Sequence, residues 1–582
     1  MNGRRRIGQE TEYAIRRPAP SNQPESNDRN NHSLFLLIRG YITDHCRCLP
    51  GYRDFYQSQF FTESGSAFAY EALPTAERDG LIEGATPECF TPLELLRYQR
   101  AQEMWLVKAL RSRRIRHDRS FHGCGLLKNC RDAEGHTYGS QENYEVEIGG
   151  FHHRWLYRLL VCLAIPVTFL GTAFMILMFL GMLFGGGLLI LTVGFLSFML
   201  ELVATAIPVA TLVSLSRWAR RTNERVLSFA SGFDEERGTR LANYTLLPIL
   251  VVTLTPFSWA LSHLTFRNVR RALTGFLISR PVISGAGCLL DDEQFVLSEK
   301  TSVLEAVLRT RATMASRSIF DSGNLLKGIH LAALDCFVLR KNNWRFLLHR
   351  HQRLQIGCSD ANRCDVAEYL KIGTTLLVIE MAEAGYLQDA PFPRSAIQAA
   401  HQYNNDTSLA STAAMQSGDA MSALELQFWY LERAQSFLRE RTTYQEIFQP
   451  VVARWQYVVK TLAAGDPEQL IGQLDWVTKK CLLDEAGHGQ GATVKKRIDL
   501  AYHELGSGYF DRFDQAGLAT RMVDRSEIES ALFCPPSPPS AQARSRFIRS
   551  ESEENSPWVI SWHWALRGLF LKQSQRDFES KH

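Results

Sequence analysis

The sequence has no marked excess of charge of either sign. Its 582 residues include 65 lysines and arginines against 61 aspartates and glutamates, which gives a net charge of +4. This balance excludes the strongly basic surface by which proteins bind nucleic acids non-specifically, so we expect no nucleic-acid partner. Cysteine is also scarce, with 12 scattered residues, and no apolar secretory segment follows Met1–Arg6. Both absences favour a reducing compartment for the soluble parts.

Charged residues are missing from a long block in the middle of the chain. Val161–Phe184 has no charged residue over 24 positions, and a membrane-spanning helix needs about 20 apolar residues. After three glycines, a second apolar run is interrupted only by Glu201 and Pro208. We predict an insertion over residues 152–270, with membrane helices at about 161–184 and 188–216 and a third apolar segment of undecided role at 244–266. Runs this apolar disfavour the alternative, a buried helical hairpin of a soluble domain.

Arginines flank the three apolar runs: Arg154 and Arg158, then Arg217, Arg220 and Arg221, then Arg267, Arg270 and Arg271. The positive-inside rule assigns all three clusters to the cytoplasm, which predicts a hairpin that crosses twice. We therefore expect a multi-pass membrane protein whose catalytic domain is cytoplasmic, with membrane lipid as a partner.

The first stretch of the chain with a clear pattern is Arg6–Ile15. Read as a strand, it places Glu10 and Glu12 side by side on one face and mostly apolar residues on the other. Two neighbouring carboxylates repel each other unless a cation lies between them, and hard oxygen ligands suit Mg²⁺. The alternative is a surface strand with two solvated glutamates, which this stretch alone does not exclude.

Further blocks follow in a set order. They are SGSAFAYE (64–71), GLIEGATPEC (80–89), KNCRDAEGHTYGSQENY (128–144), RLQIGCSDAN (353–362) and QLDWVTK (473–479). Thr91 is suited to cap a helix that continues to Arg111, because Pro92 and Glu94 follow it. Each block alone is an ordinary turn and strand, but the order is far more specific than any one of them.

With Glu10–Tyr13 (ETEY), these blocks resemble the Pup ligase and Pup deamidase/depupylase family over nearly all of the chain except roughly Phe151–Arg270. The resemblance implies an α+β, glutamine-synthetase-like fold, in which an antiparallel sheet cradle is packed with helices, beside a small C-terminal domain and the inserted membrane hairpin. The catalytic domain is then expected over residues 1–151 and 271–485, and the small domain over 486–582. Both parts of the catalytic domain must lie on the same side of the membrane, which again requires an even number of crossings.

The resemblance also implies the chemistry. Family ligases use ATP and Mg²⁺ to phosphorylate the C-terminal glutamate side chain of Pup, which a target lysine then attacks; depupylases hydrolyse the resulting bond or deamidate a C-terminal glutamine. The family motifs place the metal-binding carboxylates at Glu10, Glu12, Glu83 and Glu142. They place the nucleotide-binding residues at Lys128, Asn129 and Arg353.

Three positions depart from the family pattern. The catalytic aspartate of the family is Glu71 here, which keeps the carboxylate but moves it by one methylene. Two family histidines are replaced by Gln141 and Gln355. A glutamine exchanges hydrogen bonds but does not titrate, so proton transfer or imidazole ligation is lost at both positions.

Three functions are compatible with these residues. The favoured one is a membrane-tethered, ATP- and Mg²⁺-dependent Pup ligase or Pup deamidase/depupylase, with Glu71 as its catalytic residue and a Pup-like small protein or its conjugates as partner. The second is a catalytically impaired scaffold that still binds nucleotide. The third is a small-molecule carboxylate-amine ligase.

Overall fold

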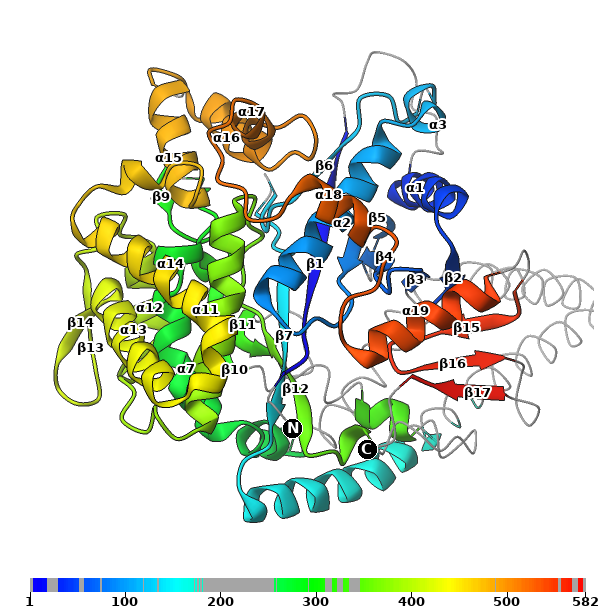
Figure 1. Ribbon diagram of the computed structural model, residues 1–582, viewed down its shortest axis with the longest axis horizontal. Helices are drawn as coiled ribbons and strands as arrows, with labels where there is room; N and C mark the ends of the chain where they lie inside the picture. The colour runs from blue at the N-terminus through cyan, green and yellow to red at the C-terminus, as the bar shows by residue number, and fades with distance from the viewer. Residues whose placement is uncertain are drawn as a thin grey trace, which may run out of the picture.

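A computed structural model gives the fold of the chain (Figure 1). It describes residues 4–17, 30–51, 57–73, 76–118, 120–132, 135–171, 173–174, 177, 181, 256–257, 259–291, 293–308, 317–321, 328–333, 346–486, 488–552, 556–567 and 574–578. The second predicted membrane helix, 188–216, lies outside these residues, as do most of the first beyond residue 171 and the first half of the third apolar segment.

A single large sheet forms the centre of the molecule. In the described part of the chain it has ten strands. Their order is β10 (Leu304–Leu308), β11 (Arg317–Asp321), β12 (His351–Ile356), β7 (Gln141–Glu147), β1 (Ile7–Arg16), β5 (Ala76–Ala85), β4 (Ala67–Leu73), β3 (Gln57–Thr62) and β2 (Cys48–Pro50), and β6 (Gly125–Leu127) pairs with β1. The pairs are antiparallel except β10 with β11, which run parallel. The sheet is therefore mixed, and the prediction of a purely antiparallel cradle is wrong at this edge.

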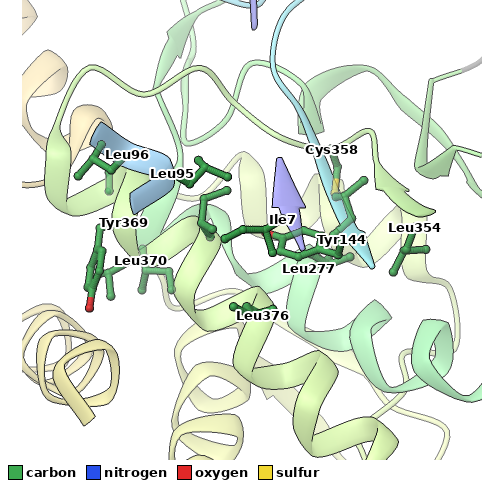
Figure 2. Close-up of a cluster of buried hydrophobic side chains, with 14 of the residues drawn as sticks. Ile7, Leu95, Leu96, Tyr144, Leu277, Leu354, Cys358, Tyr369, Leu370 and Leu376 are labelled. Atoms are coloured by element: carbon green, nitrogen blue, oxygen red, sulfur yellow. The ribbon is translucent and has the colours of Figure 1, made fainter. Parts of the chain in front are cut away.

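The predicted alternation of the first strand is confirmed. On β1, Ile7, Thr11 and Tyr13 are buried together with Gln9, and they face the helices. That face is covered by α2 (Pro92–Leu110), α7 (Arg267–Ser279) and α11 (Asp365–Glu383). Figure 2 shows leucines of these three helices gathered around Ile7 and Tyr144. The opposite face of β1, which carries Glu10 and Glu12, is left for the site.

Helix α2 begins where the sequence predicts. The Thr91 side chain accepts a hydrogen bond from the Glu94 backbone N–H at 3.2 Å, and Pro92 occupies the first turn. The described residues also form the helices α1 (Asn31–His45), α3 (Arg113–Arg116), α8 (Pro281–Ser284), α12 (Ala396–Asn404), α13 (Ala423–Glu440), α14 (Gln445–Ala463), α15 (Asp475–Ala486), α16 (Ala492–Tyr502), α17 (Tyr509–Gln515), α18 (Arg525–Ala531) and α19 (Pro539–Glu551). Short two-stranded ladders join β8 (Cys288–Leu289) to β9 (Phe295–Val296) and β13 (Thr412–Ala414) to β14 (Ala420–Ser422).

The C-terminal residues build a second, smaller core against the β2 end of the sheet (Figure 1). It combines α19 with a three-stranded sheet of β15 (Trp558–Ile560), β16 (Trp564–Arg567) and β17 (Ser574–Asp577). Arg544 of α19 is fully buried there: it pairs with Glu88 and donates to the Trp562 carbonyl at 2.7 Å. The predicted start of the small domain at residue 486 stays a prediction. Helix α16, which follows this position, packs beside α15 and β8 and not in the second core.

The first helix of the predicted insertion is described over Phe151–Gly171, and it runs along the lower edge of the molecule in Figure 1. It begins ten residues before the charge-free run, since the polar residues that follow Phe151 also fit a helix. Among the described helices it alone has the length and apolar composition to cross a membrane, and little of it is buried within the protein.

Candidate active site

Three carboxylates from three neighbouring strands converge on the open face of the sheet. Glu12 of β1 lies opposite Glu83 of β5, and Glu83 lies opposite Ala69 of β4. Because side chains alternate along a strand, Glu71 shares the face of Ala69. Glu12, Glu71 and Glu83 each offer an oxygen within 4.8 Å of the other two. We call this group the acidic cluster.

Burial and mutual repulsion both favour protonated carboxyl groups in the acidic cluster. Burial and the nearby charges of Glu12 and Glu10 raise the pKa of Glu71 to about 8. Burial, with Glu10 and Glu71, raises the pKa of Glu83 well above its ordinary value. Such a group of hard oxygen donors fits a divalent cation of the Mg²⁺ type, which would displace the protons on binding.

Glu12 is fixed by a backbone contact that needs glycine. The Gly139 N–H donates to a Glu12 carboxylate oxygen at 2.7 Å. Gly139 has φ +115°, and a Cβ at this position would collide with Cys130. Only glycine therefore lets the backbone approach the carboxylate.

Glu10 is adjacent to the acidic cluster but has a partner of its own. Arg353 of β12 donates to a Glu10 carboxylate oxygen at 2.7 Å and to the Asn143 side-chain oxygen at 2.6 Å. The Arg353 side chain is 40% exposed, so it remains accessible to a ligand. Arg353 is thus the predicted nucleotide-side residue that the structure brings to the carboxylate face.

Two cations beside Glu12 carry no motif in the sequence. Lys300 is buried and donates to the Ser140 carbonyl at 2.9 Å, and its charge opposes the upward shift that burial imposes on the pKa of Glu12. Arg317 of β11 donates to the Thr137 hydroxyl at 2.9 Å and acts on Glu12 in the same direction. Both residues come from segments far along the chain from Glu12, and the strand order of the sheet brings Arg317 here.

The two glutamines that depart from the family pattern form a pair. Gln355 of β12 donates from its amide nitrogen to the side-chain oxygen of Gln141 on β7. Gln141 lies opposite Glu10 in the ladder, so the pair borders the carboxylate face. Two amides that satisfy each other can hold this part of the site but cannot exchange a proton with a substrate.

Glu142 does not join the acidic cluster, and its predicted role as a metal ligand stays a prediction. It lies on the opposite, helix-covered face of β7, where it is fully buried. Arg280 donates to its two oxygens at 2.7 and 2.9 Å, and the Tyr144 hydroxyl donates at 2.5 Å. These contacts occupy the carboxylate with structural partners.

Lys128 and Asn129 also lie away from the carboxylate face. The Lys128 ammonium is fully buried and donates to Glu103 at 2.7 Å and to the Asn362 carbonyl at 2.6 Å. Asn129 accepts from the Tyr138 hydroxyl at 2.8 Å. Their predicted contact with nucleotide stays a prediction, and their present contacts are with the protein.

A groove runs past Glu10 and Arg353, the ion pair next to the acidic cluster. It holds about 1030 Å³ of empty space, which includes the part that is open to solvent. The segment that leads into β12 and the C-terminal module line its far part, with Phe346, His349, His351, Trp562 and His563. The Phe346 and His563 rings stack with their centroids 4.6 Å apart.

The sheet with its helical cover is the fold of the ligase PafA. A crystal structure of the complex between the prokaryotic ubiquitin-like protein Pup and its ligase PafA superposes with a TM-score of 0.62, over 99% of this chain and 88% of that chain at 18% identity. A structure of the Pup ligase PafA in complex with ADP gives a TM-score of 0.58, over 97% and 92% at 17% identity. At these identities the likeness concerns the fold, and it bears out the α+β class.

Sequence comparison gives the family. A model of the family described as Pup-ligase protein matches residues 5–566, and the chain belongs to this family. The Pup--protein ligase of Nakamurella multipartita is 28% identical over 333 residues, which are 54% of this chain and 69% of that protein. The Pup--protein ligase of Acidimicrobium ferrooxidans is 30% identical over 300 residues, 50% of this chain and 61% of that protein. The alignments thus leave about a third or more of these relatives unmatched, while the family resemblance of the sequence is confirmed.

Proposed function

We propose that this protein is an ATP-dependent ligase that joins the C-terminal glutamate of a Pup-like small protein to a lysine amine. The observation that carries the proposal is the acidic cluster of Glu12, Glu71 and Glu83, with the Arg353 guanidinium beside it. The relatives matched by sequence are ligases, which favours ligation over deamidation or depupylation.

The reaction has two balanced steps. The side-chain carboxylate of the terminal glutamate attacks the γ-phosphorus of ATP, and ADP leaves with the electrons of the broken P–O bond. The lysine amine then attacks the acyl carbon, phosphate leaves, and an isopeptide bond forms while the nitrogen loses a proton. A divalent cation bound in the site would offset the phosphate charge.

The residues of the chain have distinct parts in this proposal. Glu12 and Glu83 hold the cation, and Arg353 donates to phosphoryl oxygens in an orientation that Glu10 and Asn143 fix beforehand. Glu71 accepts the proton of the attacking amine, because the amide pair of Gln141 and Gln355 has no titrating group to do so. The groove past Glu10 takes the C-terminal segment of the small protein.

We further propose that the apolar insertion holds the enzyme in a membrane, with the catalytic body on the cytoplasmic side. The helix Phe151–Gly171 has two apolar faces. Tyr157, Val161 and Ala164 are buried. The outer face exposes an apolar stripe at helical spacing: Phe151 (70% exposed), Trp155 (61%), Leu159 (39%), Leu163 (48%) and Leu170 (65%).

A bilayer is the occupant that suits this apolar stripe. The sequence continues from the helix into the charge-free run that ends at Phe184, and arginines flank the run on its N-terminal side. A water-soluble surface rarely exposes so many large apolar side chains in one continuous row.

The test uses the full chain in lipid nanodiscs with ATP, Mg²⁺ and Pup ending in either glutamate or glutamine. We expect ADP formation and a lysine adduct, seen by intact mass, with the glutamate form and neither product with Glu71→Ala. Conversion of the terminal amide to an acid would mean that the protein is a deamidase and not a ligase. If nucleotide binds but neither assay shows turnover, the result would support the catalytically impaired scaffold instead.

A further inference from the structure

One side of the far part of the substrate groove is formed by a short segment, Phe346–Gln352, which we call the groove wall. Phe346, His349, His351 and Gln352 line the groove. The Gln352 amide holds the segment together, because its nitrogen lies 2.6 Å from the Phe346 carbonyl and 3.0 Å from that of His349. The groove wall is therefore a compact turn that leads into β12 and is held by its own hydrogen bonds.

The groove wall is bonded directly to the first helix of the insertion. Arg158 of the helix Phe151–Gly171 donates from Nε to the Leu348 carbonyl at 3.1 Å. Glu147, at the end of β7, accepts from Arg350 of the wall at 2.6 Å and from Arg154 of the helix at 3.4 Å. A further bond runs from the Ile148 N–H to the Arg350 carbonyl at 3.0 Å.

The apolar stripe begins beside these contacts. Trp155 and Leu159, which are exposed, lie within one helical turn of Arg158, or about 5.4 Å along the helix axis. The polar layer on each side of a bilayer is roughly 5–8 Å thick. A stripe that faces lipid therefore places the groove wall at the level of the lipid headgroups. Arg154, Arg158 and Arg350 are the cations expected at such a surface.

We propose that the groove opens at the membrane surface and that its acceptors are membrane-held proteins, modified on a lysine close to the bilayer. An extended chain spans at most about 3.5 Å per residue, so a lysine within roughly ten residues of the acceptor's own membrane segment can reach the groove. This inference rests on the proposed ligase function for its chemistry, but its geometry can be tested without catalysis.

The first test locates the groove wall relative to the bilayer. A fluorophore is introduced through an unnatural amino acid at His351 in the groove wall, or at Glu485 on α15 as control, in the full chain in nanodiscs. Glu485 is exposed, and its helix α15 lies at the opposite end of the molecule from the helix Phe151–Gly171 (Figure 1). With nitroxide groups on the lipid headgroups, we expect strong quenching at position 351 and little at 485. Equal weak quenching at both positions would overturn the proposal.

The second test varies the height of the acceptor lysine. Acceptors anchored in the same nanodiscs carry a single lysine after spacers of about 5, 20 and 40 residues, and a soluble acceptor gives the basal ligation rate. We expect the short spacer to be modified fastest, several-fold above the longest. Modification that needs the long spacer would overturn the inference and leave the ligase intact. If no acceptor, soluble or anchored, is modified, the proposed ligase function is wrong. The proposal that acceptors are membrane-held proteins then fails as well.

Discussion

Glu83 and Glu142 are both glutamates of the central sheet, yet they face opposite sides of it. Glu83 belongs to the acidic cluster with two other carboxylates, whereas Glu142 is fully buried against Arg280. Removing the negative charge should therefore lower Mg²⁺ affinity at Glu83 and the stability of the fold at Glu142. Comparing the two variants distinguishes a metal ligand from a structural residue.

For Glu83→Gln we expect a loss of Mg²⁺ affinity of about 10–100-fold or more, with thermal stability unchanged or raised because like-charge repulsion is relieved. Isothermal titration with Mg²⁺ and thermal unfolding of the same preparation check this. An unchanged Mg²⁺ affinity would remove Glu83 from the site.

For Glu142→Gln we expect a loss of about 3 kcal/mol of unfolding free energy, because Arg280 is left buried without a charged partner. Denaturant titration of the variant against the parent protein measures this difference. A stable variant that binds no Mg²⁺ would restore Glu142 as a ligand.

The rate of ligation should depend on the length of the side chain at Glu71. Shortening it to aspartate withdraws the carboxylate by one methylene, and a misplacement on the order of 1 Å can cost about a hundredfold in rate. We expect Glu71→Asp to slow ligation by about that factor while ADP binding changes little. Single-turnover kinetics and nucleotide titration distinguish the two. An aspartate variant faster than the parent would mean that the chain has departed from an optimal family geometry.

The residues show what could be predicted from the sequence. The strand Gln141–Glu147 alternates in type, and Glu142 shares its parity with Tyr144 and Val146, which are core residues. That alternation alone assigns Glu142 to the core, although the family motif assigned it to the metal. Lys300 and Arg317 could not be found in this way, because no local pattern indicates which distant segments a sheet brings beside Glu12.

At the scale of elements, strand alternation and the helix cap were predicted well because both depend on local chemistry. Thr91, Pro92 and Glu94 determine the start of α2 within a single turn. The parallel edge of the sheet, β10 beside β11, depends on long connections and has no comparable local signal.

The attachment of α19 to the catalytic sheet should depend on pH. Burial by itself would raise the pKa of Glu88, but the Arg544 guanidinium outweighs burial and holds this pKa below its ordinary value. A carboxylate with a lowered pKa stabilises the folded state above its unfolded pKa of about 4.3, and this contribution is lost as the pH falls below that value. We expect hydrogen exchange in α19 and β15–β16 to accelerate below about pH 4 before the core around α11 does. In Glu88→Gln the same region should exchange faster already at pH 7.

The apolar stripe should determine how firmly the whole molecule associates with membranes. A charge at Leu163 should weaken the association of the protein with membranes, because a charged side chain in lipid costs about 3 kcal/mol. We expect Leu163→Glu to be extracted by alkaline carbonate more readily than the parent. The matched control is Leu518→Glu, since Leu518 is a similarly exposed leucine (57%) outside the apolar insertion. Equal extraction of both variants would argue against lipid at this face.

The pairing of β7 with β12 also constrains the order in which the molecule is made. Glu147 and Arg350, which meet at the end of this pair, are 203 positions apart, and the apolar insertion lies between them. At about 5–20 residues per second of synthesis, β7 waits roughly 10–40 s for its neighbour. During this interval its free edge can pair with other chains. We expect the nascent chain to need a chaperone at this edge, and insertion of the apolar block into the membrane to precede closure of the catalytic sheet.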